Sequence, residues 1–228
     1  MRFTTGTWIK RNLWVLLLFS IHSSLFAQST LSPLAPLSHL ESLAATRYGD
    51  QAVRSVNQWR LLLDSSQSLS EQEKLQRINR FFNLHVYYDE DRRIWQKADY
   101  WATPLETLAR ARGDCEDFTI AKYVSLRLLN VPANKLKLTY VNLISDPEDK
   151  AAQQHMVLAY YPSETADPLI LDNLKGQILP ASSRPELKPV FSFNDEKLWV
   201  AGIPRHEDPQ QQLGRWRDVL TRIHQDGL

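Results

Sequence analysis

The sequence predicts an α+β fold, in which a group of helices is followed along the chain by an antiparallel sheet. Two observations support this prediction. As far as residue 129, apolar side chains recur at the spacing of amphipathic helices, whereas from residue 136 they alternate as in strands that bury one face. No internal repeat or low-complexity tract interrupts either pattern. Helices and strands segregated along a chain are typical of α+β domains.

The first 27 residues are predicted to be a secretory signal peptide, which would place the mature protein in the periplasm. Lys10 and Arg11 precede an apolar run over 13–21, and Leu25 and Ala27 occupy the −3 and −1 positions of a cleavage site. A transmembrane helix needs about 20 apolar residues, so this run is too short to span a bilayer. An uncleaved membrane anchor is the alternative.

Residues 28–228 are then expected to form a single domain. The chain has 228 residues, of which 43% are hydrophobic and 23% are charged, as in an ordinary globular protein. The formal net charge is +1 and basic residues occur at most in isolated pairs. A nucleic acid is therefore not expected as a partner.

Each element follows from its own local pattern. Helices are predicted over 38–48, 51–63 and about 209–224. A further helix is predicted to begin after the capping box of Ser70 and Glu73, another to run from Pro104 to near Gly113, and another to begin at Asp114 or Cys115. Strands are predicted over 136–144, 155–161, 168–172, 177–179 and 197–202, with a polar loop over 145–154. Residues 89–100 are charged and aromatic and are expected to form an irregular connection.

Cys115, the only cysteine in the chain, is the candidate nucleophile. It follows a Gly113-Asp114 turn and begins a helix, where unpaired backbone N–H groups and the helix dipole favour a thiolate. Its own backbone N–H is a candidate oxyanion-hole donor. Exported proteins usually pair their thiols, so a single one is either reactive or a buried inert residue. We interpret it as catalytic.

His155 and Asp172 are the candidate partners of this thiol. His155 begins a strand directly after a polar loop, where site residues commonly emerge from a rigid scaffold. If the two strands form a hairpin with Tyr161 opposite Pro168, Val157 faces Asp172. His155 and Asp172 then become diagonal neighbours on one face, although a slip of one residue would separate them. In this register Asp172 orients the imidazole that addresses Cys115.

Three carboxylates, Asp114, Glu116 and Asp117, flank the candidate nucleophile. Acidic residues in a first helical turn serve as caps, and this alone would explain them. Their charge would nevertheless raise the pKa of the thiol and oppose thiolate formation. A bound cation would remove that penalty, and hard oxygen ligands in an exported protein indicate Ca²⁺.

The sequence resembles the bacterial transglutaminase-like cysteine proteinases, most closely those of the LapG type. The resemblance lies in the run Trp101-Ala-Thr-Pro-Leu-Glu-Thr-Leu, in the run Gly113-Asp-Cys-Glu-Asp-Phe with Ala121-Lys-Tyr, and in His155 and Asp172. The resemblance covers about residues 38–225 and is most specific over 113–123.

This resemblance implies a papain-like fold of the transglutaminase branch, with Cys115 on a central helix and His155 and Asp172 on the sheet. It implies a calcium-dependent protease with Asp114 and Glu116 as calcium ligands and Asp117 as a weaker candidate. Such proteases cut large surface adhesins near their N-terminus, typically after two alanines, and so disperse biofilm. An inner-membrane cyclic-di-GMP receptor restrains them through its periplasmic domain. Trp101 is a candidate for the second oxyanion donor.

Two other functions are compatible with the same residues. A transglutaminase, which transfers an acyl group to an amine, would use the same Cys-His-Asp triad. An exported interaction module with a structural cysteine would use no triad at all.

Overall fold

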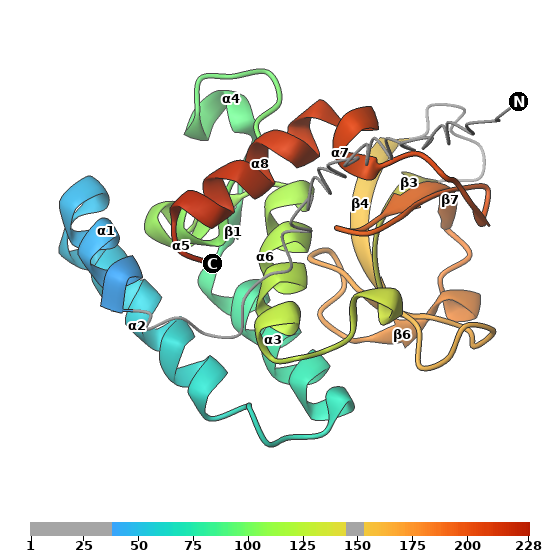
Figure 1. The fold of residues 1–228 in the computed structure, drawn as a ribbon, viewed down its shortest axis with the longest axis horizontal. Helices are drawn as coiled ribbons and strands as arrows, with labels where there is room; N and C mark the ends of the chain where they lie inside the picture. The colour runs from blue at the N-terminus through green and yellow to red at the C-terminus, as the bar shows by residue number, and fades with distance from the viewer. Residues whose placement is uncertain (1–37, 145–152) are drawn as a thin grey trace, which may run out of the picture.

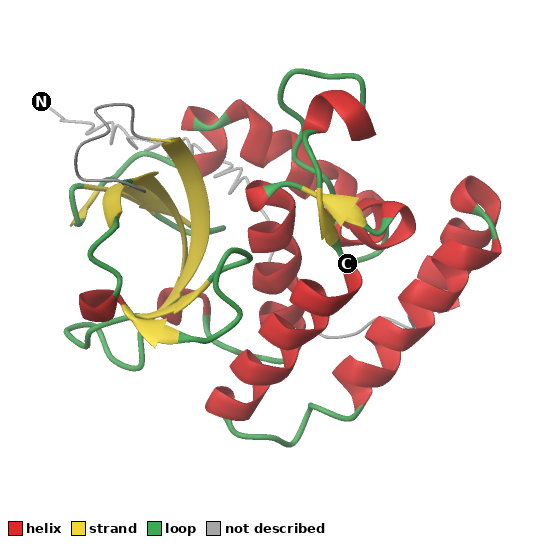
Figure 2. Ribbon diagram, turned by 180° about the vertical axis from the view of Figure 1, so that it is seen from behind, coloured by secondary structure: helices red, strands yellow, loops and turns green. Residues whose placement is uncertain are grey.

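The computed structural model describes residues 38–144 and 153–228. The predicted signal peptide and most of the polar loop predicted over 145–154 lie outside the described residues. Helices and sheet occupy opposite sides of the molecule, and helix α6 (Cys115–Leu128) lies between them (Figures 1 and 2). The predicted α+β class is confirmed.

The other helices are α1 (Ser38–Tyr48), α2 (Asp50–Asp64), α3 (Glu71–His85), α4 (Asp91–Ile94), α5 (Pro104–Arg110), α7 (Pro209–Gln212) and α8 (Gly214–Gln225), with single 3₁₀ turns η1 (Ala133–Lys135) and η2 (Ala181–Ser183). The strands are β1 (Tyr87–Tyr88), β2 (Arg112–Gly113), β3 (Leu136–Leu143), β4 (Gln153–Tyr160), β5 (Leu169–Leu171), β6 (Leu179–Pro180), β7 (Leu187–Phe193), β8 (Leu198–Val200) and β9 (Ile203–Pro204). Within the described ranges, no helix is long and apolar enough to cross a bilayer.

Strands β3 to β9 form one antiparallel sheet in the order β6-β5-β4-β3-β7-β8-β9, and it curves strongly (Figure 2). Strands β1 and β2 form a separate, short parallel pair. Helix α6 contacts β3 and β4 on one side and α3 and α5 on the other. It is consequently buried along most of its length, as expected of the central helix of a core.

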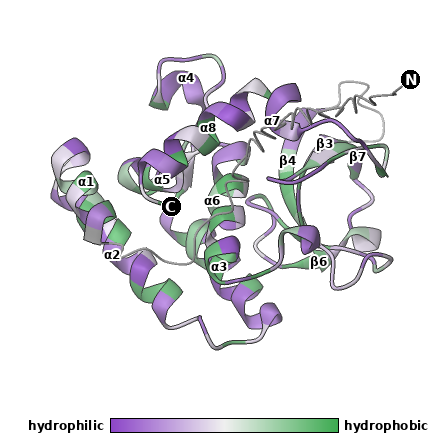
Figure 3. Cartoon of the chain, viewed as in Figure 1, coloured by the Kyte–Doolittle hydropathy of each residue, from purple (hydrophilic) through white to green (hydrophobic). Residues whose placement is uncertain are grey.

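The helices predicted before residue 100 are confirmed at the predicted positions, and the signal predicted to start α3 is present. The capping box of α3 forms as predicted, because Ser70 Oγ accepts from the Glu73 N–H while the Glu73 carboxylate accepts from the Ser70 N–H. The outer helices α2 and α3 alternate between hydrophilic and hydrophobic segments (Figure 3), and their apolar sides face the core.

Three predictions about elements need correction. The helix that Pro104 starts ends at Arg110 rather than near Gly113, because Ala111 adopts a left-handed conformation and the next two residues join β2. The segment predicted to be irregular contains α4. The closing helix is divided at Leu213 into α7 and α8.

Strand β7 was not predicted, although it is an interior strand of the sheet, between β3 and β8. Its sequence contains Pro189, which cannot donate to a ladder hydrogen bond and argues against a central strand. The structure accommodates the proline at a shift of register, where Pro189 pairs with Val141 and Phe191 pairs with Tyr140. A bulge of this kind is a place where a sheet tolerates proline.

Candidate active site

Cys115 is the first residue of α6 and is half-buried. The loop before it is held by the β1–β2 pair, in which Tyr88 lies opposite Gly113 and the Asp89 N–H donates to the Gly113 carbonyl at 3.0 Å. A Cβ atom on Gly113 would lie 2.7 Å from Cβ of Asp117. Only glycine therefore lets the loop pack this closely against the first turn of α6.

The thiol of Cys115 lies between a carboxylate and the sheet. It donates to Oε2 of Glu116 at 2.7 Å, while the backbone N–H of Met156 donates to the sulfur. Burial raises the pKa of the thiol, and the charges of Glu116 and Asp114 raise it further; the Met156 N–H opposes them. The carboxylates and burial thus outweigh the helix dipole, as the acidic flanks predict.

His155 and Asp172 are brought together as the predicted hairpin register requires. Leu158 pairs with Leu171 and Ala159 pairs with Ile170, which is the predicted register. His155 Nε2 lies 2.9 Å from Asp172 Oδ1, and the two residues are only 4% and 1% exposed.

The hydrogen bond between them also fixes the tautomer of the imidazole. Asp172 is ionised, since its pKa is lowered to about 2, so its carboxylate can only accept and the proton lies on His155 Nε2. The other ring nitrogen, Nδ1, makes no hydrogen bond with any residue that the structure describes and is available as a base. Met156, which contacts the thiol, directly follows His155, so β4 runs alongside Cys115.

The acidic residues around the thiol form two overlapping groups. Potential ligand atoms of Asp114, Cys115 and Glu116 lie within 4.8 Å of one another, and the same holds for Asp91, Asp114 and Asp117. Of the three predicted metal ligands, Asp114 thus belongs to both groups, whereas Glu116 and Asp117 each belong to one. Asp91, in α4, was missed, because the prediction considered only residues next to Cys115.

Two oxygens of this acidic cluster are buried without a hydrogen-bond partner within the described part of the chain, Asp91 Oδ1 and Asp117 Oδ2. The second oxygen of each is paired: the Tyr100 N–H donates to Asp91 Oδ2, and the Ala102 N–H donates to Asp117 Oδ1 at 2.7 Å. Backbone donors thus hold both carboxylates in place with one oxygen free. Fixed, unpaired carboxylate oxygens suit a hard cation such as Ca²⁺.

The electrostatics of the cluster support the same reading. Burial, followed by the charge of neighbouring carboxylates, raises the pKa of Asp114 to about 10. Burial likewise raises the pKa of Asp91 to about 6 and holds that of Asp117 well above its ordinary value. Three carboxylates in one buried place repel each other unless protons or a cation neutralise them.

A cleft of about 410 Å³ adjoins Glu116 and is walled by aromatic side chains, namely Trp101, Tyr140 and Phe191. Trp101 Nε1 is buried and makes no hydrogen bond of ordinary geometry within the described ranges, although the indole lies near enough to Asp99 to lower the pKa of that carboxyl. The structure therefore leaves Trp101 as a candidate donor whose nearest acceptor is Asp99. Glu116 directly follows Cys115, so the cleft opens next to the start of α6, although Cys115 itself is not part of its lining.

Comparisons with known proteins agree with this geometry. Residues 38–201 match the family model described as bacterial transglutaminase-like cysteine proteinase. A solved structure of Legionella pneumophila LapG is 36% identical, with a TM-score of 0.71 over 84% of this chain and 99% of that one. None of the curated proteins compared with the chain matches it.

Two further structures of Legionella pneumophila LapG bear on the acidic cluster. An EGTA-treated form is 36% identical, with a TM-score of 0.72 over 84% of this chain and 100% of that one. A calcium-bound form is 37% identical, with a TM-score of 0.69 over 82% and 98% respectively. These matches confirm the resemblance seen in the sequence and the papain-like, transglutaminase-type fold that it implies.

Proposed function

The chain belongs to the bacterial transglutaminase-like cysteine proteinases, and on this premise we propose that it is an endopeptidase whose triad is Cys115, His155 and Asp172. One observation carries the proposal. The buried hydrogen bond from His155 to Asp172 leaves Nδ1 free on the strand whose next residue, Met156, contacts the thiol. This arrangement supports a nucleophile, a base and an orienting carboxylate that act together near the start of α6.

In the proposed reaction, His155 Nδ1 takes the proton of the Cys115 thiol as the sulfur attacks the carbonyl carbon of the scissile peptide. The backbone N–H of Cys115 and the Trp101 indole N–H are the candidate donors to the oxyanion. Collapse of the tetrahedral intermediate breaks the C–N bond, and His155 returns the proton to the leaving amine. Water, deprotonated by His155, then hydrolyses the thioester and regenerates the thiol.

We propose further that the acidic cluster holds Ca²⁺, with Asp114 and Glu116 as ligands, Asp117 and Asp91 completing the carboxylate set. The unpaired oxygens of Asp91 and Asp117 support this assignment, as does the calcium-bound form of Legionella pneumophila LapG. When bound, the cation neutralises the charge that otherwise raises the pKa of Cys115, and so favours the thiolate.

The substrate, location and regulator are proposed from the family resemblance. The substrate would be the N-terminal region of a large surface adhesin, so that cleavage releases the adhesin and promotes dispersal of a biofilm. The signal-like N-terminus supports a periplasmic location. The periplasmic domain of an inner-membrane cyclic-di-GMP receptor would be the inhibitor.

The test mixes an N-terminal adhesin fragment with the wild-type protein and with Cys115→Ala, in Ca²⁺ and in the presence of a labelled amine. We expect wild type to produce two fragments and Cys115→Ala to lose at least about 10⁴-fold in rate. Circular dichroism of Cys115→Ala serves as the control for folding.

Two results would redirect the proposal. Incorporation of the amine without chain cleavage would indicate a transglutaminase. Cleavage that persists in Cys115→Ala would remove the cysteine mechanism altogether.

A further inference from the structure

The carboxylate of Asp172 receives hydrogen bonds from three donors, and only one of them belongs to the proposed triad. Oδ1 accepts from His155 Nε2 at 2.9 Å and from the Leu174 N–H at 3.0 Å, while Oδ2 accepts from Arg184 Nη2 at 2.7 Å. The backbone carbonyl of Asp172 accepts from Asn83 Nδ2 at 2.8 Å, which ties the residue to α3. Several independent hydrogen bonds therefore fix the position of this carboxylate.

Arg184 is itself held rigidly and is only 2% exposed. Its Nε donates to Glu186 Oε1 at 2.6 Å, and the same oxygen accepts from Lys175 Nζ at 2.8 Å. The Arg184 N–H donates to the Ala181 carbonyl at 2.9 Å, and the Arg184 carbonyl accepts from the Leu187 N–H at 3.0 Å. A chain of hydrogen bonds therefore runs from His155 through Asp172 and Arg184 to Glu186 and Lys175.

The guanidinium has two effects on Asp172. Burial alone would raise the pKa of this carboxyl, but the hydrogen bonds from His155, Arg184 and Leu174 lower it to about 2. Arg184 also restrains the rotation of the carboxylate, because it holds Oδ2 while Oδ1 addresses the imidazole. An ionised and fixed acceptor at Oδ1 keeps the imidazole proton on Nε2.

We propose that Arg184 is a positioning residue, which fixes the Asp172 carboxylate so that His155 presents an unprotonated Nδ1 to Cys115. The inference rests on the proposed function, since it assigns a part to Arg184 in the same triad. Within the described residues, the side chain of Arg184 hydrogen-bonds to Asp172 and Glu186 and to neither Cys115 nor His155, so in this proposal it acts through Asp172.

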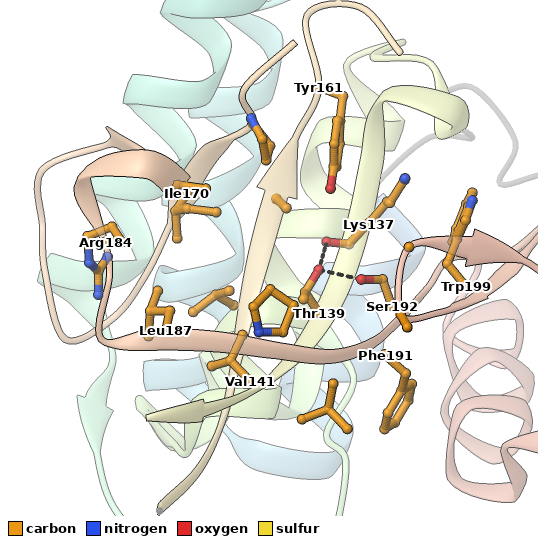
Figure 4. Close-up of a pocket in the computed structure, with 18 residues that line it drawn as sticks. Lys137, Thr139, Val141, Tyr161, Ile170, Arg184, Leu187, Phe191, Ser192 and Trp199 are labelled. Carbon is orange, nitrogen blue, oxygen red and sulfur yellow. Dashed lines mark hydrogen bonds between the residues drawn. The ribbon is translucent and has the colours of Figure 1, made fainter. Parts of the chain in front are cut away.

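The place of Arg184 in the fold offers a direct test. It lies at one end of a pocket of about 340 Å³ on the concave face of the sheet, beside Ile170 and Leu187, with Lys137 and Trp199 toward the other end (Figure 4). Val190, which also lines the pocket, is 43% exposed, so the pocket reaches solvent. In Arg184→Ala, a small guanidinium ion could therefore re-enter the vacated site.

The experiment measures cleavage of the adhesin fragment in Ca²⁺ by wild type and by Arg184→Ala. We expect kcat to fall by about 100-fold with little change in KM, because orienting partners of this kind typically contribute 10- to 100-fold. Methylguanidinium should restore at least about a tenth of the lost rate, whereas equal concentrations of NaCl or urea should not. Arg184→Lys, which can reach Asp172 or Glu186 but not both, should retain an intermediate kcat.

Arg127→Ala is the matched control. Arg127 is also a mostly buried arginine, 13% exposed in its side chain, and is paired with Asp195 at 3.6 Å on the same helix as Cys115. Its loss should lower the melting temperature without changing kcat, and methylguanidinium should have no effect on its rate.

A second readout does not depend on any substrate. In protein labelled with ¹⁵N-histidine, wild type should show His155 as the Nε2–H tautomer and Arg184→Ala should show a mixture of tautomers. An unchanged kcat in folded Arg184→Ala, or an unchanged tautomer, would overturn the inference. If wild type fails to cleave, the protease proposal fails, but the tautomer still decides the role of Arg184.

Discussion

The two halves of the candidate site treat buried carboxylates in opposite ways. In the acidic half, formed by Asp91, Asp114, Glu116 and Asp117, two oxygens have no hydrogen-bond partner within 38–144 and 153–228, and the aspartate pKa values are raised. In the sheet half, formed by His155, Asp172 and Arg184, both carboxylate oxygens are paired and the pKa of Asp172 is lowered to about 2. Protein groups therefore satisfy both carboxylate oxygens of the sheet half, where the one unpartnered buried atom among the described residues is a cationic donor, Arg184 Nη1. The acidic half instead has the charge and the free oxygens to receive a cation.

The largest expected effect is a difference in sign between two Asp→Asn substitutions in the calcium-free protein. Asp172→Asn should lower the free energy of unfolding by about 3 kcal/mol, because it removes the buried carboxylate that pairs with Arg184 Nη2 and leaves Glu186 as the one carboxylate bonded to the guanidinium within the described residues. Asp114→Asn should raise the free energy of unfolding, because a carboxyl whose pKa rises to about 10 must take up a proton on folding at neutral pH, whereas asparagine is already neutral and still caps α6. Urea unfolding in EGTA, followed by circular dichroism, measures both.

Asp218→Asn is the control for these two variants, since its side chain is 67% exposed and should change stability by less than about 0.5 kcal/mol. Destabilisation by Asp114→Asn as large as that by Asp172→Asn would contradict the contrast between the halves.

The pH dependence of the Asp172 contribution should be next in size. A carboxyl whose pKa is lowered on folding stabilises the protein above its unfolded pKa and loses that contribution as the pH falls through its folded pKa. For Asp172 the contribution is roughly 2 kcal/mol at neutral pH and is lost between about pH 4 and about pH 2. The difference in free energy of unfolding between wild type and Asp172→Asn should therefore shrink as the pH falls. A difference that stays constant from pH 6 into this range would argue against an ionised, paired Asp172.

The smallest expected effect concerns Asp91. Asp91→Asn should weaken calcium binding about 10-fold, or about 1.4 kcal/mol, because it removes one charged oxygen ligand. Asp89→Asn is the matched control, since Asp89 is also a buried aspartate of the same segment but is paired with Arg112 at 2.7 Å. Isothermal titration calorimetry compares the two. Equal calcium affinity in Asp91→Asn and wild type would exclude Asp91 from the cation site.

The parts of the site that follow from local pattern could be predicted from the sequence. The position of Cys115 at a helix start follows from the Gly113-Asp114 turn, and the pairing of His155 with Asp172 follows from the register of one hairpin. Both depend on residues close together in sequence, for which turn chemistry and alternation of side chains are sufficient information.

The residues that were missed depend on contacts between distant segments. Asp91 reaches the acidic half only because α4 and the loop after it fold against the start of α6, where the Tyr100 N–H holds its carboxylate. Arg184 reaches Asp172 only because the 3₁₀ turn after β6, η2, brings the chain back toward the end of β5. Neither residue belongs to a periodic pattern, so tertiary packing alone reveals its partner.

The measurement that tests the central claim most directly is cleavage of an adhesin N-terminal fragment by the wild-type protein in excess Ca²⁺, after addition of EGTA, and after Ca²⁺ is restored. The contrast between the halves predicts that EGTA abolishes cleavage, that Ca²⁺ restores it, and that Asp114→Asn and Glu116→Gln remain folded but inactive. Cleavage at an unchanged rate in excess EGTA would contradict the claim that a cation completes the acidic half.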